Sequence, residues 1–201
     1  MESTEHEGRT IMRIFFVIDH SVELKDFSLN ALSSENGRVD LVCKLIKDSF
    51  LISNSIRKDT VLYIFFSKSK KTIMFIGNQL LYLNPDERSI ASILKKVFLL
   101  YLKEKIIGKE YSPGIYLYNW NIEEVLKRIN LPVVLLLEEG IMDTTKIRQN
   151  VAFVLSDHTN FSTEEIDIIK NYNPFILKIS PYSLHTDQCI TIIHNKLDVM
   201  L

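Results

Sequence analysis

Short apolar runs recur along the chain, and most of them are apolar at nearly every position rather than at every second one. Such runs are typical of strands that are buried on both faces of a sheet. The pattern predicts buried strands at residues 14–18, 61–66, 72–76, 115–118, 133–137, 151–155 and 175–179. A further short strand is predicted at residues 80–83.

Segments in which apolar residues recur every three or four positions separate these runs. They predict helices within residues 38–52, 84–107, 121–129 and 162–170, and a last helix over residues 189–197. Asn84 is the predicted N-cap of the second helix, with proline in the first helical position and Glu87 completing a capping box. Ser162 and Glu165 predict another capping box at the start of the fourth helix.

The alternation of strands and helices predicts an α/β fold, with a mainly parallel sheet that carries helices on both faces. No internal repeat, low-complexity segment or linker divides the chain, so residues 12–201 are predicted to form a single domain. Residues 1–11 are polar and acidic, which predicts a flexible N-terminal extension. No run of about 18 apolar residues occurs, so no membrane span is expected.

Three predicted strands in the last third of the chain end in polar loops. These loops begin at Glu138, Ser156 and Ser180. In open parallel sheets, ligands bind beyond the carboxyl ends of the strands. The pattern therefore predicts a ligand site at these three loops.

Composition narrows the classes of function. The chain has 24 Lys and Arg against 25 Asp and Glu, a formal charge of −1 and 46% hydrophobic residues, as expected of an ordinary globular protein. A nucleic-acid surface would have to be a local patch. Two lysine clusters are candidates, although each also fits a solvated face: Lys68, Lys70 and Lys71, and Lys95, Lys96, Lys103, Lys105 and Lys109.

The two cysteines, Cys43 and Cys189, are too few for a disulfide framework and lack the spacing of a zinc site. We therefore expect a reducing, intracellular setting, no metal, and a buried free thiol at Cys43. No Gly-rich phosphate loop, GxSxG, HExxH or CxxC motif occurs. His185 lies four residues before Cys189, which allows a Cys–His nucleophile pair. A helix-start residue beside a packing residue is the simpler interpretation.

Three further groups of charged residues allow two interpretations each. Asp157 and His158 could form an acid–base pair, or the aspartate could cap backbone amides of its loop. Arg38 with Asp40, and residues 57–59 with their Arg and Asp, could bind phosphate or carboxylate because the planar guanidinium suits both. Surface ion pairs explain these charges equally well.

Several stretches of the chain, in the same order, resemble one family. They are FSLNAL, NGRVDLVCKLIKDSFLIS, SIRKDTVLY, LLYLNPDERSIASILKK, SPGIYL, FVLSDH and SPYSLHTDQCITIIHNKLD. The resemblance covers nearly the whole chain, from about residue 12 to residue 198. On these stretches the chain resembles the archaeal tRNA (pseudouridine(54)-N(1))-methyltransferase family of the SPOUT superfamily.

The resemblance implies a sheet whose last strand and helix thread through a trefoil knot, a feature too rare to propose from a pattern. It also implies S-adenosylmethionine bound by three knotted loops, a homodimer, and methylation of a pseudouridine in the T-loop of tRNA in the cytoplasm. Carried over position by position, the implied cofactor-binding residues are Leu136, Gly140, Ser156, Asp157, Ser180, Leu184 and Cys189.

Three positions depart from the family's usual residues. Ser156 stands where glycine is usual, and Leu137 and Gln188 stand where histidine is usual. A side chain at position 156 could crowd a cofactor that is held against the backbone.

The implied reaction explains why the common catalytic motifs are absent. N1 of pseudouridine carries a proton, so methyl transfer needs alignment of the reacting atoms and a way for that proton to leave. Asp40 and Asp59 are the candidates for handling the proton, and Arg38 and Arg57 for binding RNA or stabilising negative charge. Two other functions stay open: a knotted RNA-binding dimer without catalysis, and a methyltransferase for another RNA pseudouridine.

Overall fold

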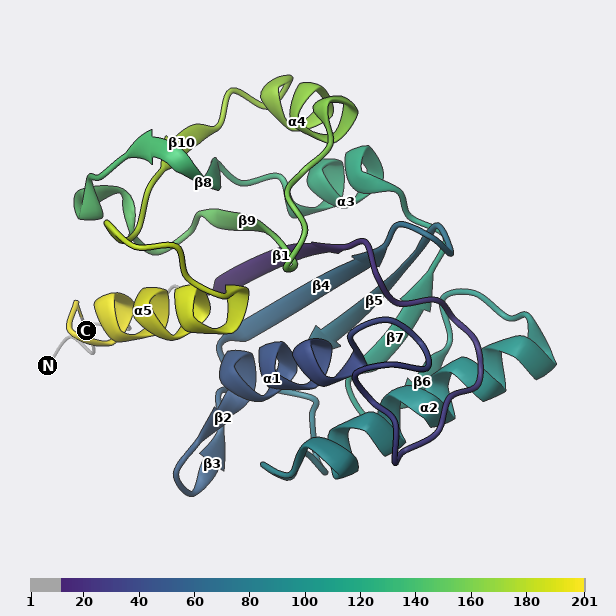
Figure 1. The fold of residues 1–201 in the computed structure, drawn as a ribbon. Coiled ribbons are helices and arrows are strands. Elements are labelled where there is room, and N and C mark those ends of the chain that lie inside the picture. The colour runs from purple at the N-terminus through teal and green to yellow at the C-terminus, as the bar shows by residue number, and fades with distance from the viewer. Residues whose placement is uncertain (1–11, 201) are drawn as a thin grey trace, which may run out of the picture.

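An eight-stranded sheet runs through the middle of the molecule in the computed structural model, which describes residues 12–200 (Figure 1). The strand order is β10-β8-β9-β1-β4-β5-β7-β6. The strands are β1 (Arg13–Asp19), β4 (Thr60–Phe66), β5 (Lys71–Ile76), β6 (Glu110–Ser112), β7 (Ile115–Tyr118), β8 (Val133–Ile141), β9 (Ala152–Ser156) and β10 (Phe175–Leu177). The flexible extension predicted for residues 1–11 lies outside the described residues.

Strand direction divides the sheet into two parts. The pairings from β10 through β8, β9 and β1 to β4 are all parallel. The pairings of β5 with β4 and β7, and of β6 with β7, are antiparallel. The predicted α/β fold with a mainly parallel sheet is therefore confirmed, while the knot stays a prediction.

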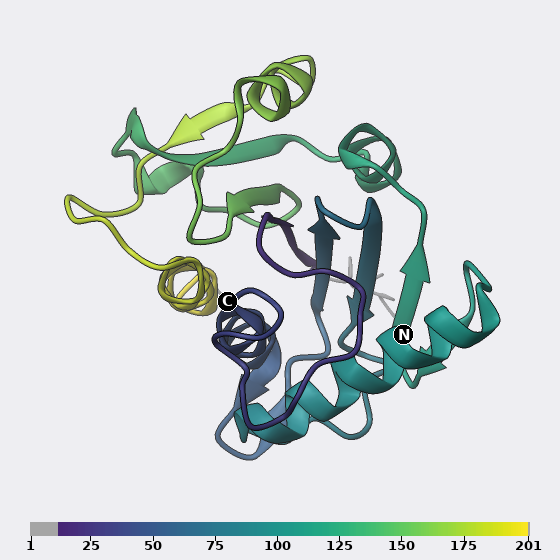
Figure 2. The ribbon, with the colours of Figure 1, turned by 45° about the vertical axis from the view of Figure 1, so that its right-hand side comes forward.

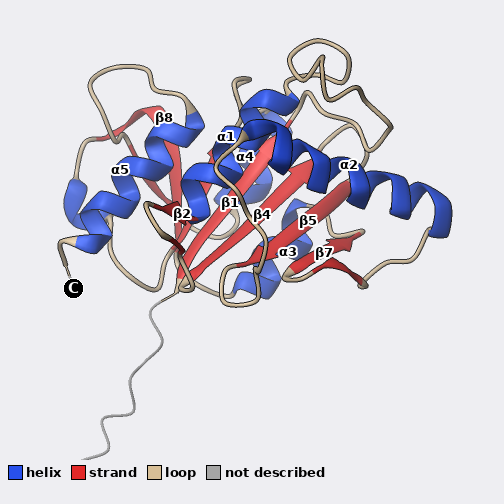
Figure 3. Ribbon diagram, turned by 90° about the horizontal axis from the view of Figure 1, so that it is seen from below, coloured by secondary structure: helices blue, strands red, loops and turns tan. Residues whose placement is uncertain are grey.

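Helices cover both faces of the sheet. One face carries α1 (Val39–Phe50), α2 (Glu87–Glu104) and α5 (Thr186–Asp198), and the other carries α3 (Ile122–Ile129) and α4 (Thr163–Lys170). The first three lie across the strands in Figure 3, and Figure 2 shows α5 beside α1. A single-turn 3₁₀ helix, η1 (Thr144–Lys146), follows β8. Two separate apolar cores result, one on each side of the sheet.

Some local predictions differ from the structure at element ends. Asp86, not Asn84, is the N-cap of α2, because its backbone is extended and its carboxylate accepts from the Ser89 amide at 2.9 Å. The capping boxes at α3 and α4 are formed by Asn121 with Glu124, and by Ser162 with Glu165. The second of these confirms its prediction.

The predicted strand at residues 80–83 is wrong. Leu80 and Leu83 are buried, but they reach the core from a loop without strand pairing. The sequence pattern also missed β6 and a small hairpin of β2 (Leu51–Ile52) and β3 (Ser55–Ile56). Strands of two or three residues are too short for a period of two to be recognised.

A buried arginine joins the first strand to the last helix. Arg13 is 2% exposed at the start of β1, and its Nη1 lies 2.6 Å from Asp198 Oδ1 at the end of α5. Its Nε lies 2.8 Å from Asp59 Oδ2, although the N–H does not point along that line, so this contact is ionic rather than a hydrogen bond. Arg57 donates two hydrogen bonds to Asp198, at 2.9 and 2.7 Å.

His194 of α5 completes this network from the inside. Its Nε2 lies 3.0 Å from the Ser49 carbonyl, which can only accept, so Nε2 carries the proton and Nδ1 accepts from Arg13 at 3.1 Å. Burial, together with the positive charges of Arg57 and Arg13, lowers the pKa of His194 to about 3. The imidazole is therefore neutral and acts as a structural acceptor.

Removing the buried guanidinium should destabilise the fold. We expect Arg13→Gln to lower the free energy of unfolding by about 3 kcal/mol, because Asp59 is left without its cation. Urea unfolding measures this loss. The matched control is Lys127→Gln, which breaks the exposed pair with Glu123 and should cost less than about 1 kcal/mol. Equal losses in the two variants would contradict the structural role of Arg13.

Candidate functional site

A pocket lies at the carboxyl ends of the parallel strands, where the sequence predicts a ligand site. It has a volume of about 680 Å³ and lies among the loops that follow β8, β9 and β10, with the first turn of α5 closing one side. Six of the seven residues implied by the resemblance line it: Leu136, Ser156, Asp157, Ser180, Leu184 and Cys189. The carboxyl ends of these strands meet at one edge because the strands are parallel neighbours.

Gly140, the seventh residue, is not among the residues that line the pocket. A Cβ at this position would lie 2.6 Å from the carbonyl carbon of Leu177, the last residue of β10, and 2.7 Å from the nitrogen of Lys178, which follows it. Glycine is therefore required by the close approach of β8 to β10. Its structural role shapes the first loop without placing it in the pocket.

Side-chain hydrogen bonds join the three loops to one another. The Ser183 hydroxyl of the third loop donates to Glu138 of the first. Thr186, in the first turn of α5, donates to the Ser156 carbonyl of the second loop at 2.5 Å. The Ser156 hydroxyl donates to the Thr159 carbonyl inside its own loop. The serine that replaces the usual glycine thus has an internal partner for its hydroxyl.

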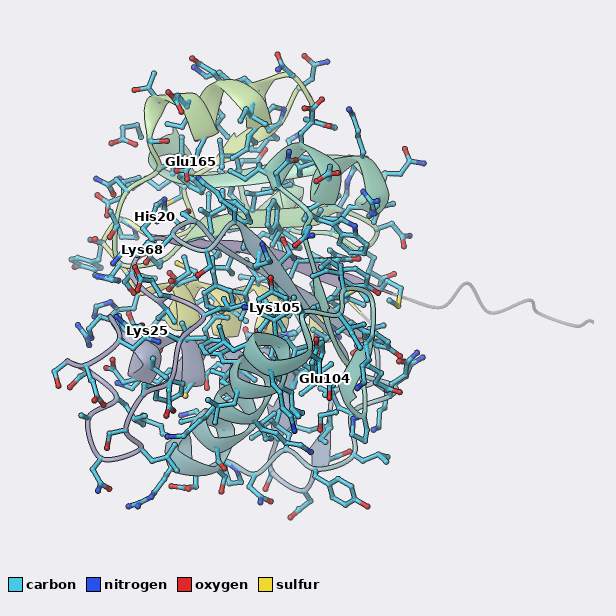
Figure 4. All side chains as sticks on the ribbon, turned by 90° about the vertical axis from the view of Figure 1, so that its right-hand side faces the viewer. His20, Lys25, Lys68, Glu104, Lys105 and Glu165 are labelled. Atoms are coloured by element: carbon cyan, nitrogen blue, oxygen red, sulfur yellow. The ribbon has the colours of Figure 1, made fainter. Side chains whose placement is uncertain are left out.

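His20 holds the second loop in place, a role that the sequence analysis missed. Its Nδ1 lies 2.8 Å from Asp157 Oδ1, and its Nε2 lies 2.9 Å from Glu165 Oε2. The backbone amide of His20 also donates to Asp157 Oδ2 at 2.9 Å. Figure 4 shows His20 between Glu165 and Lys68 at the edge of the molecule. One histidine thereby connects β1, the loop after β9 and the start of α4.

The pKa values show that this cluster is charged at neutral pH. The hydrogen bond to Asp157 raises the pKa of His20 to about 9 against the opposing effect of burial, with Glu165 adding to the rise. Burial raises the pKa of Asp157, but hydrogen bonds from His20 and Thr159 outweigh it and hold that pKa below its usual value. An imidazolium between two carboxylates is therefore the stable form.

This geometry decides between the two interpretations of the Asp157–His158 pair. The carboxylate of Asp157 is occupied by His20, and His158 Nδ1 lies farther away, at 3.4 Å. Asp157 is a positioning residue for its loop. The position of His20 directly after a buried strand was a signal that the sequence offered. Its partners could not be found in the same way, because they lie 137 and 145 positions away.

Arg38 and Asp40 lie near the pocket, at the start of α1. The guanidinium donates to both carboxylate oxygens, at 2.9 and 2.8 Å. The next residues of α1, Leu41 and Val42, line a cavity of about 20 Å³ together with residues of the second and third loops. The Arg38 hydrogen bonds lower the pKa of Asp40 in spite of its partial burial. One of the two predicted charged pairs thus directly precedes residues that line the small cavity beside the second loop, although neither member lines the pocket itself.

The structure does not bring the other pair to the pocket within one chain. Arg57 and Asp59 precede β4, whereas the pocket lies beyond the carboxyl ends of the strands. β4 has seven residues, which separates the two edges by about 23 Å. The expected pairing is also absent, because Arg57 binds Asp198 and Asp59 contacts Arg13.

Cys189 and Gln188 have structural explanations. Burial raises the pKa of the Cys189 thiol to about 11, so it stays protonated and is a poor nucleophile. The Gln188 side chain accepts from the His185 amide at 2.9 Å and caps α5.

Cys43 is a buried free thiol, as predicted. Among the described residues, no group of three His, Cys, Asp or Glu side chains is arranged to hold a metal ion.

Comparison with known proteins assigns the chain to a family. Residues 12–201 match the family described as "Putative SAM-dependent RNA methyltransferase". The chain belongs to this family. Two curated relatives are named tRNA (pseudouridine(54)-N(1))-methyltransferase. The one from Methanococcoides burtonii is 32% identical and the one from Haloferax volcanii 34%, each over 93% of this chain and 96% of the relative. The resemblance inferred from the motifs is confirmed.

A solved structure supports the fold of this methyltransferase. It is that of Archaeoglobus fulgidus Nep1 bound to S-adenosylhomocysteine, with a TM-score of 0.67 and 13% identity over 94% of this chain and 98% of that one. At this identity the likeness shows the fold alone. No helix in residues 12–200 is long and apolar enough to cross a membrane.

Breaking the His20 contacts should destabilise the methyltransferase in a pH-dependent way. We expect His20→Ala to lower the free energy of unfolding by about 2–3 kcal/mol at pH 6.5, since two carboxylates lose their shared cation. A folded-state pKa of about 9, above the ordinary 6.5, means that the contribution of His20 is complete below pH 6.5 and is lost as the pH rises through 9.

Urea unfolding at pH 6.5 and 9.5 measures both effects. The wild type and His20→Ala should converge in stability at the higher pH. His158→Ala, at the exposed neighbouring histidine, is the matched control and should be nearly neutral. A constant difference between wild type and His20→Ala across this range would refute the charged form of His20.

Proposed function

We propose that this protein methylates N1 of pseudouridine 54 in the T-loop of tRNA, with S-adenosylmethionine as the methyl donor. The observation that carries the proposal is the pocket, where the three loops implied by the sequence meet around about 680 Å³. The names of the archaeal relatives supply the substrate. We further propose that the enzyme acts as a homodimer in the cytoplasm.

The residues of the pocket fit the proposed cofactor. Its volume lies within the usual range of small-molecule sites, about 300–1,000 Å³. Leu136, Leu155 and Leu184 offer apolar walls for an adenine ring, and Glu138 and Glu139 offer carboxylates for the positive charges of a sulfonium and an ammonium. When bound, S-adenosylmethionine supplies an electrophilic methyl group. Ser156 and Ser180 would hold it largely through their backbone groups.

The chain's own residues would then orient the base and accept its proton. Asp40 is ionised at neutral pH because Arg38 lowers its pKa, so it is ready to take a proton but is a weak base while paired. Arg38 is partly exposed and could bind a phosphate or the deprotonated ring, which would release the carboxylate. The target base must leave its stack to reach such a site. We assign Arg57 and Asp59 to stability.

The position of the proton on the target base gives the sharpest test of the reaction. We expect methyl transfer to a T-arm hairpin RNA with pseudouridine at position 54 and none to the same RNA with uridine, because N1 of uridine is bonded to the sugar. Incorporation of labelled methyl groups measures both. Equal labelling would rule out N1 methylation. Calorimetry that finds no S-adenosylmethionine binding would favour a non-catalytic RNA-binding protein instead.

Substitutions of the two candidate proton acceptors, Asp40 and Asp59, should have different effects on kcat and on stability. We expect Asp40→Asn to lower kcat about 100-fold, within the usual contribution of a general base, with the Kd for S-adenosylmethionine unchanged. Asp59→Asn should lower the free energy of unfolding but leave kcat within about twofold. Single-turnover methylation and urea unfolding distinguish the two. A large kcat loss in Asp59→Asn would mean that the opposite edge of a second chain reaches the pocket.

A further inference from the structure

A ladder of flat side chains lies on the sheet away from the pocket. Tyr116, Tyr118 and Trp120 project from β7 and the residues that follow it. The rings of Tyr118 and Trp120 are stacked at 3.5 Å with an angle of 4°, and those of Tyr116 and Tyr118 are nearly parallel at 6.4 Å. The Arg128 guanidinium also lies over the Trp120 ring, at 4.3 Å from its centroid. Three aromatic rings and a guanidinium thus lie close together on one surface.

The ladder is held in place but keeps exposed surface. The Tyr116 hydroxyl donates to Gln79 at 2.8 Å, and the Trp120 carbonyl accepts from Thr72 at 2.7 Å. All three aromatic residues are nevertheless only partly buried, and Arg128 is exposed. Partly exposed aromatic residues that are already ordered lose little entropy when a flat ligand stacks on them.

Strand register connects this ladder to the cofactor pocket. Ser156 pairs with Ile18, Ile18 with Phe65, Phe65 with Thr72, and Thr72 with Tyr118. Residues paired in this way lie in one row on the same face of the sheet. Four strand-to-strand steps of about 4.8 Å place Tyr118 about 19 Å from Ser156. A large substrate that reaches into the pocket could therefore also contact the ladder.

Positive charge accompanies the aromatic rings. Lys70, in the turn between β4 and β5, lies over the Phe65 ring at 5.9 Å, on the same face as the ladder. In residues 12–200, neither Lys70 nor Arg128 takes part in an ion pair. The nearby Glu123 and Glu124 are already engaged, by Lys127 and by the cap of α3 respectively. Two unneutralised cations beside stacked aromatics suit a polyanion with flat bases.

We propose that Tyr116, Tyr118, Trp120 and Arg128 form a second RNA-binding surface, on which unpaired bases of the RNA substrate stack while Arg128 and Lys70 contact phosphates. Base–aromatic stacking and arginine planes are common means of binding unpaired RNA. This inference rests on the proposed RNA methylation, but it concerns how the protein binds the RNA outside the target base. It explains how a chain with a net charge of −1 binds a polyanion.

Intrinsic fluorescence tests the surface directly, because Trp120 is the only tryptophan in the chain. Titration with a T-arm hairpin RNA should quench its emission. Tyr118→Leu, which keeps apolar bulk without a ring, should raise the KM for the RNA about tenfold, with kcat and S-adenosylmethionine affinity unchanged. Arg128→Gln, at an exposed position, should reduce the slope of log affinity against log salt by about 0.7.

Tyr82→Ala is the matched control, since Tyr82 is 78% exposed and lies in the loop after β5, at the opposite edge of the sheet. A KM for Tyr118→Leu no higher than that of this control, or unchanged emission at saturating RNA, would overturn the inference. Emission that depends on protein concentration without RNA would assign the face to contacts between chains instead. If the wild type transferred no methyl group but RNA still quenched Trp120, the proposed reaction alone would fail.

Discussion

The hydrogen bonds between His20 and Asp157 fix the edge of the sheet on which the pocket depends. Parallel pairing brings the ends of β8, β9 and β1 together, but pairing alone leaves the loops beyond them free to move. His20 removes that freedom for the second loop, because its two ring nitrogens bind carboxylates of Asp157 and Glu165. Ser183 and Thr186 then connect the third loop to the other two. Hydrogen bonds within the chain thereby connect all three loops that line the pocket.

The charged residues at the two edges of the sheet serve different purposes. Around Arg13, carboxylates and a second arginine form ion pairs, and a neutral His194 accepts a hydrogen bond from Arg13 Nη1. This network holds the end of α5, whose first turn supplies Cys189 to the pocket. At the start of α1, by contrast, Arg38 is partly exposed and paired with Asp40. The ion-pair network and the pocket thus lie at opposite ends of the same strands and of the same helix.

Sequence patterns predicted what is local and missed what is distant. Buried strands such as residues 14–18 and the capping box at Ser162 can be read from a few neighbouring residues. The positions of the three loops followed from the rule for parallel sheets. The partners of His20 and Arg13 could not be found in this way, because between 46 and 185 positions separate the contacting residues. Asp59 was a candidate for proton handling because it matches the family, and its contact with Arg13 could not be seen from the sequence.

Contacts that the sequence does not reveal also explain why residues that depart from the family pattern need not weaken the site. Ser156 seemed able to crowd the pocket, yet its hydroxyl binds the Thr159 carbonyl and its own carbonyl accepts from Thr186. Gln188 replaces a usual histidine but caps α5 through the His185 amide. Both side chains thus have hydrogen-bond partners within the chain. Where a ligand is held largely by backbone groups, side chains at the loop positions are free to vary as long as they preserve the backbone that they support.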